Sequence, residues 1–361
     1  MFIDPHVHCR DEEESYKETI AHALSVAERV GFTAIFDIPN LKPNPVIDRQ
    51  SAVERLTLAA NAKSPVKYGM YILLTPDPRQ IKEAVSTYNE FKFDSERSQQ
   101  LGNAVFIAGL KEFCGCDSVG PSSVKTRKDR QLVNQVLSDE GYASVKMTHC
   151  EEELQFCKEI WNPEHPASHS FSRPSSAEVQ CISDEIQDCI DAKFKGVLHI
   201  THISVPGAVD LVDQARSSLR IACGVTPHHI LFDRERMDAP DGLLYKMNPP
   251  LRGRGLNAAM LCYLKEGKID WIETDHAPHT LDEKLKSPYM SGIPGLAFYP
   301  LFVMRLKGHG FSEEQIRGIT FNNICRSFGL ILSPREVSIN SEVCKEMAKE
   351  YAFDPYKELY K

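Results

Sequence analysis

The sequence predicts a single (β/α)8 barrel, or TIM barrel, and three observations lead to this fold class. Eight short β-branched or apolar runs recur along the 361 residues. Longer amphipathic or polar stretches separate them, as in α/β proteins with a parallel sheet. Metal-capable side chains stand at the carboxyl ends of several runs, where this fold builds its active sites. The predicted strands are residues 2–8, 32–38, 66–73, 104–111, 143–149, 196–202, 219–225 and 269–275.

The stretches between the runs predict helices. YKETIAHALSVAERVG (16–31) repeats apolar residues at spacings of three and four and ends at a glycine, a common helix terminator. DPRQIKEAVSTYNEF (77–91) begins with an aspartate that can cap a helix. Residues 176–193 and 206–218 continue the pattern, whereas the long, proline-rich connection over 226–268 predicts a functional loop.

The whole chain is therefore divided into two parts. Residues 1–332 are expected to form the catalytic barrel, and residues 333–361 a C-terminal helical tail packed on it. Because the chain starts directly at the first barrel strand, no substantial accessory β-domain is expected. The tail could close the lower face of the barrel or join two chains in a homodimer.

Composition limits the partners of the protein. The chain is 42% hydrophobic and 25% charged, with a net charge of −8, so neither nucleic acid nor an anionic membrane surface is an expected partner. No apolar run approaches the roughly 20 residues of a membrane span. The N-terminus lacks a basic region followed by a long apolar one, so a secretory signal is not expected. A small-molecule substrate is expected instead.

Eleven cysteines are scattered along the chain, and an odd number without paired short spacings indicates reduced thiols in a cytoplasmic protein. The one short spacing is Cys114-Gly115-Cys116. These two cysteines could bind a metal, but two soft ligands without a second pair are a weak signal.

A metal site is predicted from DPHVHCR (4–10), at the first strand. Successive side chains of a strand point to opposite faces, so His6 and His8 share one face. Other strands offer further candidates at their carboxyl ends. Together they suffice for two divalent ions, provided that one group bridges both ions. These further candidates are Lys111, His149, His202 and Asp275.

The bridging candidate is Lys111. A lysine pressed among cations loses its proton more easily, and the neutral amine can add carbon dioxide to become a carbamate with an oxygen for each ion. His199 and His202 are three residues apart and should face opposite sides of a strand. His202, nearer the carboxyl end, is the expected ligand, and His199 is expected to pack outward.

Seven stretches, spread from residue 4 to about residue 300, resemble the dihydroorotases of the cyclic amidohydrolase superfamily, which are metal-dependent hydrolases. The resemblance implies reversible hydrolysis of the ring amide between L-dihydroorotate and N-carbamoyl-L-aspartate, in pyrimidine (UMP) biosynthesis. The stretches are DPHVHCR, DIPNLKPN, GLKEF, MTHCEEE, HITHIS, KMNPPLR and ETDHAPHT.

The resemblance also implies how the ligands divide. His6, His8, Lys111 and Asp275 would hold one ion, and Lys111, His149 and His202 the other, with Lys111 carboxylated. Such ligands suit zinc, manganese or cobalt, and zinc is the first choice. A hydroxide bridging the ions would attack the ring carbonyl, and Asp275 would pass its proton to the leaving nitrogen.

Substrate choice depends on charge. A planar guanidinium binds a carboxylate in a bidentate manner, and Arg10 stands two residues beyond His8. By resemblance, Asn40 and His279 share that contact, while Asn248 and the turn holding Gly292 and Gly295 hold the amide edges of the ring. Residues 280–295 are the candidate loop to cover the substrate. The acids at 11–14, where relatives often have Pro-Gly, would weaken an anion site unless they turn to solvent.

Other functions remain as alternatives. Arg10 argues against a hydantoinase or dihydropyrimidinase, whose substrates carry no carboxylate there, but allantoinase stays open. A non-catalytic dihydroorotase-like scaffold should have lost metal ligands, and every matched ligand is present. A single-metal deaminase on the same barrel would not need Lys111.

Overall fold

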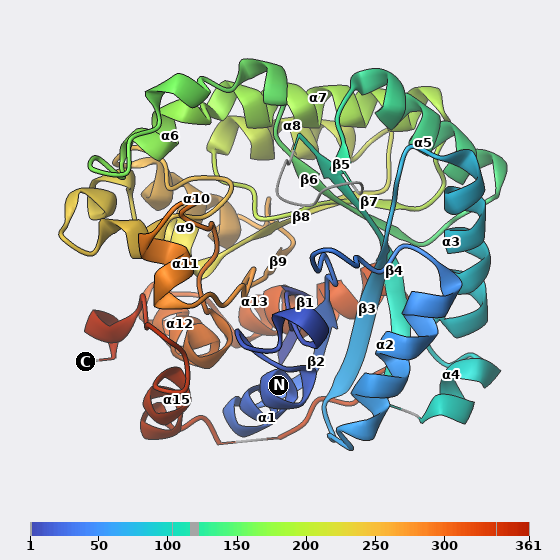
Figure 1. Cartoon of the computed structure of the whole chain (residues 1–361), viewed down its shortest axis with the longest axis horizontal. Coiled ribbons are helices and arrows are strands. Elements are labelled where there is room, and N and C mark those ends of the chain that lie inside the picture. The colour runs from blue at the N-terminus through green and yellow to red at the C-terminus, as the bar shows by residue number, and fades with distance from the viewer. Residues whose placement is uncertain (1, 103, 116–122, 337, 361) are drawn as a thin grey trace.

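A computed structural model describes residues 2–102, 104–115, 123–336 and 338–360 of the chain. Parallel strands form a barrel at its centre, and helices surround them (Figure 1). All eight predicted strands are confirmed, adjacent to one another in chain order. The strands are β1 Phe2–Val7, β2 Phe32–Asp37, β3 Lys67–Leu73, β4 Val105–Cys114, β6 Val145–Cys150, β7 Val197–Ile200, β8 Ile221–Val225 and β9 Trp271–Ile272, with a short β5, Ser123–Val124, beside β4.

A parallel bridge between Val7 and His276 joins the first strand to the segment after the last. The backbone N–H of His8 donates to the carbonyl of His276 across this seam, at 2.7 Å. The strands lie between two apolar layers: one fills the inside of the barrel, and the other separates the strands from the surrounding helices. This explains why they appear in the sequence as nearly continuous apolar runs.

The predicted helices are present as α1 Ile20–Val30, α3 Pro78–Phe91, α7 Ser175–Asp191 and α8 Pro206–Ala215. Thr19 caps the start of α1, and Gly31 ends it in the left-handed region, at φ 98°. The other α-helices are α2 Arg49–Asn61, α4 Glu96–Leu101, α5 Arg127–Asp139, α6 Ser168–Ser172, α9 Pro227–Leu231, α10 Leu256–Lys265, α11 Leu281–Leu285, α12 Tyr299–Gly308, α13 Glu313–Arg317, α14 Asn323–Phe328 and α15 Ser341–Ala348.

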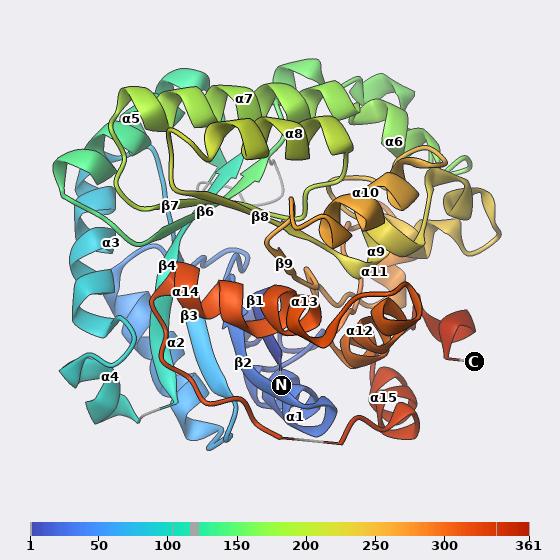
Figure 2. The ribbon, with the colours of Figure 1, turned by 180° about the vertical axis from the view of Figure 1, so that it is seen from behind.

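The amino-terminal end of the barrel is closed by α14 and the turn before it, which lie across the strands in Figure 2. The ring of Phe328 lies 5.1 Å from that of Phe36 and 6.1 Å from that of Trp271, which are both inside the barrel. The rings that fill this face therefore precede position 333. Arg335 of the tail reaches its edge, where its backbone N–H donates to Oγ1 of Thr33 at 3.0 Å and its Nη1 to the carbonyl of Phe32 at 2.9 Å.

The rest of the described tail packs on the outside of the barrel. Helix α15 contacts α1 and α12, and the ring of Tyr356 stacks on Phe298 with 4.3 Å between centroids. The hydroxyl of Tyr351 donates to Glu18, which stands just before α1. The homodimer stays a prediction. Across the described part of the chain, no helix combines the length and the apolar character that crossing a bilayer requires.

Candidate active site

A cavity of about 340 Å³ opens at the carboxyl ends of the barrel strands. Ten of the twelve residues predicted for the site line it, although they come from positions 6 to 292 of the chain. Lys111 lies beneath the cavity surface, and Gly295 is elsewhere. The ten residues are His6, His8, Arg10, Asn40, His149, His202, Asn248, Asp275, His279 and Gly292.

The candidate metal ligands form two adjoining groups. One oxygen of Asp275 lies 3.1 Å from Nε2 of His6 and 3.1 Å from Nε2 of His8. His149 and His202 form the second group, with 2.9 Å between Nδ1 of the first and Nε2 of the second. The rings of His6 and His202 are 5.2 Å apart, so the two groups meet in one cluster.

Lys111 is fully buried beside this cluster, and its Nζ makes no hydrogen bond to any residue in the described ranges. Burial lowers the pKa of Lys111 to about 8, against the opposing attraction of Glu273 and Asp275. A buried ammonium without a hydrogen-bond partner is costly. Such an orphaned nitrogen, next to imidazole and carboxylate donors, fits a site that holds divalent ions.

Further contacts fix the orientation of the imidazole rings. Nδ1 of His8 lies 3.1 Å from the carbonyl of Ile38 and 2.9 Å from Oδ1 of Asn40. Nε2 of His149 lies 3.1 Å from a carboxylate oxygen of Glu151, which Arg173 holds in turn. Partners of this kind select the tautomer of a metal-binding histidine. Asn40 thus reaches the cavity while contacting a metal-ligand candidate.

Arg10 lies on another wall of the cavity. Its Nη2 is 3.1 Å from Nε2 of His279, and its Nε donates to the carbonyl of Pro278 at 3.3 Å. Burial lowers the pKa of His279 to about 3, so this ring is neutral at pH 7 and does not repel the guanidinium. Arg10 itself has a positive φ of 52°, which is uncommon for a residue with a side chain.

The acids after Arg10 mostly turn away from it. Glu12 and Glu13 are exposed, and Asp11 caps the backbone near α1 by accepting from the N–H of Ile20 at 2.8 Å. Glu14 alone among these four lines the cavity, 3.6 Å from Nη1 of Arg10. Three of the four acids therefore do not line the predicted anion site.

The remaining predicted residues behave differently from one another. Asn248 turns Oδ1 toward Nε2 of His169, at 2.9 Å. Gly292 has φ 135°, and a Cβ there would lie 2.8 Å from atoms of Ala277, so the turn requires glycine. Gly295 does not border the cavity; its N–H donates to Nδ1 of His276 behind the site.

Comparison with known proteins complements this geometry. No family model matches the chain. A dihydroorotase of Fusobacterium nucleatum is 30% identical over an alignment of 366 positions, which spans 98% of this chain and 79% of that protein. A dihydroorotase of Brevibacillus brevis is 34% identical over 321 residues, covering 84% and 67%. The chain belongs to the dihydroorotase family.

Solved structures agree on the fold of this family member. An L-hydantoinase (dihydropyrimidinase) from Arthrobacter aurescens has a TM-score of 0.76 at 20% identity, over 91% of this chain and 70% of that one. A dihydropyrimidinase from Brevibacillus agri has a TM-score of 0.73 at 19% identity, over 94% and 73%. At such identities the likeness shows the fold alone, a TIM barrel.

One expectation about the histidines is wrong. His199 does not pack outward but lies inside the barrel of this dihydroorotase-family protein, 2.9 Å from Glu273 and beside Trp271. The strand ends at Ile200, and His202 has a positive φ of 37°. The strict alternation of a strand therefore stops between the two histidines, and both side chains reach the interior.

Sequence reasoning also missed several residues of the site. Glu273 holds both groups of the cluster, because its Oε1 accepts from the backbone N–H of His202 and lies 3.5 Å from Nδ1 of His6. Arg173, between α6 and α7, and Lys246, in the connection between α9 and α10, also line the cavity. Glu273 had a signal in the sequence, since it precedes Asp275 by two residues and would share its face of the strand predicted over 269–275.

Proposed function

We propose that this family member is a dihydroorotase that interconverts L-dihydroorotate and N-carbamoyl-L-aspartate. The observation that carries the proposal is a single cavity that borders both the His–Asp cluster and the buried Arg10. The His–Asp cluster can act on a ring amide, and Arg10 can anchor a carboxylate. The cavity therefore fits a ring that carries both groups.

In this proposal the ions are divided as the family resemblance implies. His6, His8 and Asp275 would hold one, and His149 with His202 the other, with zinc as the first choice. Divalent ions there would lower the pKa of a bound water and withdraw electrons from the amide carbonyl.

Lys111 is proposed as the group between the two ions. At a pKa of about 8, roughly one molecule in ten carries a neutral amine at pH 7. The amine nitrogen would add to the carbon of CO2 and release a proton, and the resulting carbamate offers two oxygens. Burial supports this step, because it both frees the amine and protects the carbamate from solvent protons.

Asp275 is the proposed proton carrier. Its side chain borders the cavity, whereas the neighbouring carboxylate of Glu273 is fully buried and held by histidines. Asp275 would take the proton of the attacking water and give it to the ring nitrogen as the amide C–N bond breaks. In ring closure the same carboxylate would return the proton.

The charge around the cavity supports an anionic substrate. Apart from histidines, its lining holds five cationic side chains and only two acidic ones, Glu14 and Asp275. A cavity lined mostly by one sign of charge concentrates small molecules of the opposite sign. The five cations are Arg10, Lys17, Lys42, Arg173 and Lys246.

The setting proposed for this reaction is pyrimidine biosynthesis in the cytoplasm. The cysteines that the structure describes are free thiols, which suits a reducing compartment.

The test is a ring-opening assay with dihydroorotate, allantoin and dihydrouracil. We expect dihydroorotate to be opened fastest, the activity to disappear on chelation, and zinc to restore it. Circular dichroism of the chelated protein should show that the barrel is intact. Faster turnover of allantoin or dihydrouracil, or full activity without metal, would contradict the proposal.

A further inference from the structure

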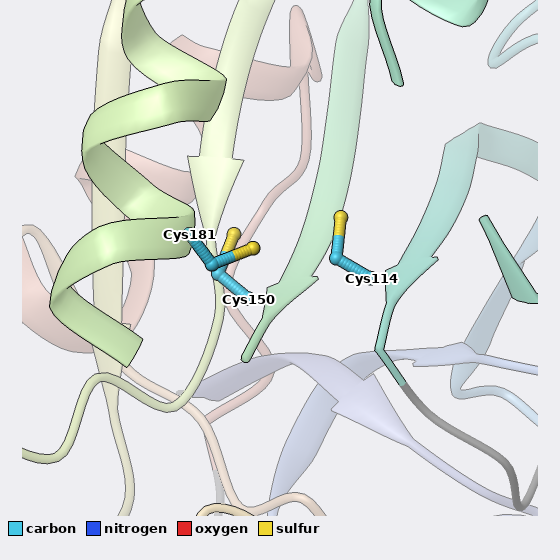
Figure 3. A group of neighbouring side chains, drawn as sticks. All are labelled: Cys114, Cys150 and Cys181. Atoms are coloured by element: carbon cyan, nitrogen blue, oxygen red, sulfur yellow. The ribbon is translucent and has the colours of Figure 1, made fainter. Parts of the chain in front are cut away.

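Three buried cysteines lie together in the layer between the barrel and its helices. Cys114 ends β4, and Cys150 ends β6 directly beside it in the sheet register. Cys181 reaches the pair from α7, which packs on β6. Figure 3 shows the sulfur atoms of Cys150 and Cys181 directed toward the strand that carries Cys114.

The geometry of this cluster suits one small ion. The three sulfur atoms lie within 4.8 Å of one another. An ion bound to three thiolates with metal–sulfur bonds of about 2.3 Å would hold the sulfurs about 4 Å apart. Only small side-chain movements are therefore needed. Since the three residues are 0%, 3% and 0% exposed, the site is closed to bulk water.

A second observation is the state of Arg130 on α5. Its guanidinium is fully buried and close enough to Cys114 and Cys181 for its charge to act on both. Nη2 donates to Glu152 at 2.9 Å and lies 3.7 Å from Asp184, but Nε and Nη1 have no hydrogen-bond partner within the described residues. Buried N–H groups of an arginine are rarely left without a hydrogen-bond partner. Thiolate sulfurs would accept hydrogen bonds from these N–H groups.

Two carboxylates lie near the cluster, and a lysine binds both of them. Glu112 and Glu185 approach Cys114 closely enough to form a second potential site. However, Nζ of Lys146 donates to Glu112 at 2.7 Å and also to Glu185. Lys146 therefore holds one oxygen of each carboxylate, and the three thiols are the soft donors of this layer.

We propose that Cys114, Cys150 and Cys181 form a three-thiolate site for a single thiophilic ion of the d10 class, separate from the active site. Each thiol would lose its proton to solvent as its sulfur–metal bond forms. A divalent ion with three thiolates carries one net negative charge, which the unpartnered N–H groups of Arg130 would stabilise. Soft thiolate ligands select such ions over magnesium or calcium.

The ion would connect three elements of the fold. β4 carries Lys111, β6 carries His149, and α7 packs on β6 from outside. An ion bound to all three elements would stabilise them against separation, because a preformed site is absent from the unfolded chain. The inference does not depend on the reaction proposed above.

The experiment is a titration of the reduced whole protein with Cd²⁺, with absorption of thiolate-to-cadmium charge transfer as the readout. Histidine and carboxylate ligands give no such band, so ions in the active site do not contribute. We expect the charge-transfer band to stop increasing when each protein molecule holds one cadmium ion on its thiolates. Absence of the band in the reduced wild-type protein would overturn the proposal without any variant.

Variants then locate the site. Cys181→Ser and Cys114→Ser should weaken cadmium binding by at least the roughly 10- to 100-fold that loss of an outer partner of a metal ligand causes. Cys344→Ser is the matched control, because Cys344 is also buried but lies on α15. An unchanged band in folded Cys181→Ser and Cys114→Ser, or its loss in Cys344→Ser, would contradict the assignment.

Discussion

Replacing Lys111 with methionine should make the metal-free protein more stable while it weakens metal binding. Methionine has a similar length and no charge, and it would fill the same buried space. In the native protein the pKa of Lys111 falls from 10.5 to about 8. Because one pKa unit corresponds to about 1.4 kcal/mol, keeping this lysine protonated costs about 3 kcal/mol at neutral pH.

The sign of this effect depends on pH in a defined way. The folded-state pKa lies below the unfolded one, so between pH 8 and pH 10.5 the unfolded chain binds more protons. Stability of the metal-free wild type should therefore rise with pH across this window. The advantage of Lys111→Met should be largest below pH 8 and should disappear near pH 10.5.

The assay is thermal unfolding of chelated wild type, Lys111→Met and the control Lys128→Met, whose lysine is exposed. We expect a Tm several degrees higher for Lys111→Met at pH 7 and no change for the control. Added zinc should stabilise the wild type more than Lys111→Met, since ions bind only the native state. A metal-free Lys111→Met protein less stable than wild type at pH 7 would refute this reasoning.

Three further predictions concern other parts of the molecule. Arg10→Met should lower kcat/KM for dihydroorotate by about a hundredfold, as expected for the loss of about 3 kcal/mol from charged hydrogen bonds. Arg254→Met is the kinetic control, because the side chain of Arg254 is 82% exposed. Phe328→Ala should destabilise the protein by about 3–5 kcal/mol, measured by denaturant unfolding, because it empties the closed end of the barrel; a loss below about 1 kcal/mol would contradict that packing role. The hydrogen bond to Glu18 raises the pKa of His22. Its stabilising contribution should therefore be complete below about pH 6.5 and be lost as the pH rises through the higher folded value. The Tm difference between wild type and His22→Gln should then shrink from pH 6 to pH 9, and a constant difference would count against this contact.

Much of the barrel could be predicted because each strand is buried on both sides. Such strands must be apolar along their length, and polar helices between them mark where each one ends. The carboxyl ends of the strands then indicate which histidines can meet. For this reason His6, His8, His149 and His202 could be grouped from positions nearly 200 residues apart.

Features that depend on the path of irregular segments could not be predicted. The direction of His199 follows from where β7 stops, and strand alternation does not encode that point. Arg173 and Lys246 enter the cavity from connections between helices, whose course has no periodic signal. Among the cysteines, sequence spacing drew attention to Cys114 and Cys116. Cys116 lies outside the described residues, and the thiols near Cys114 come from distant segments.

The carboxylate of Glu273 connects opposite ends of the barrel interior. One of its oxygens serves His202 and His6, and the other contacts His199 and Trp271, whose rings pack on Phe328 at the closed end. Directed evolution aimed at heat tolerance would usually treat the closed amino-terminal end of such a barrel as independent of catalysis. Here, libraries that vary residues at the closed end would also reorient the imidazoles at the carboxyl ends of the strands. Thermostability and turnover should therefore be screened together.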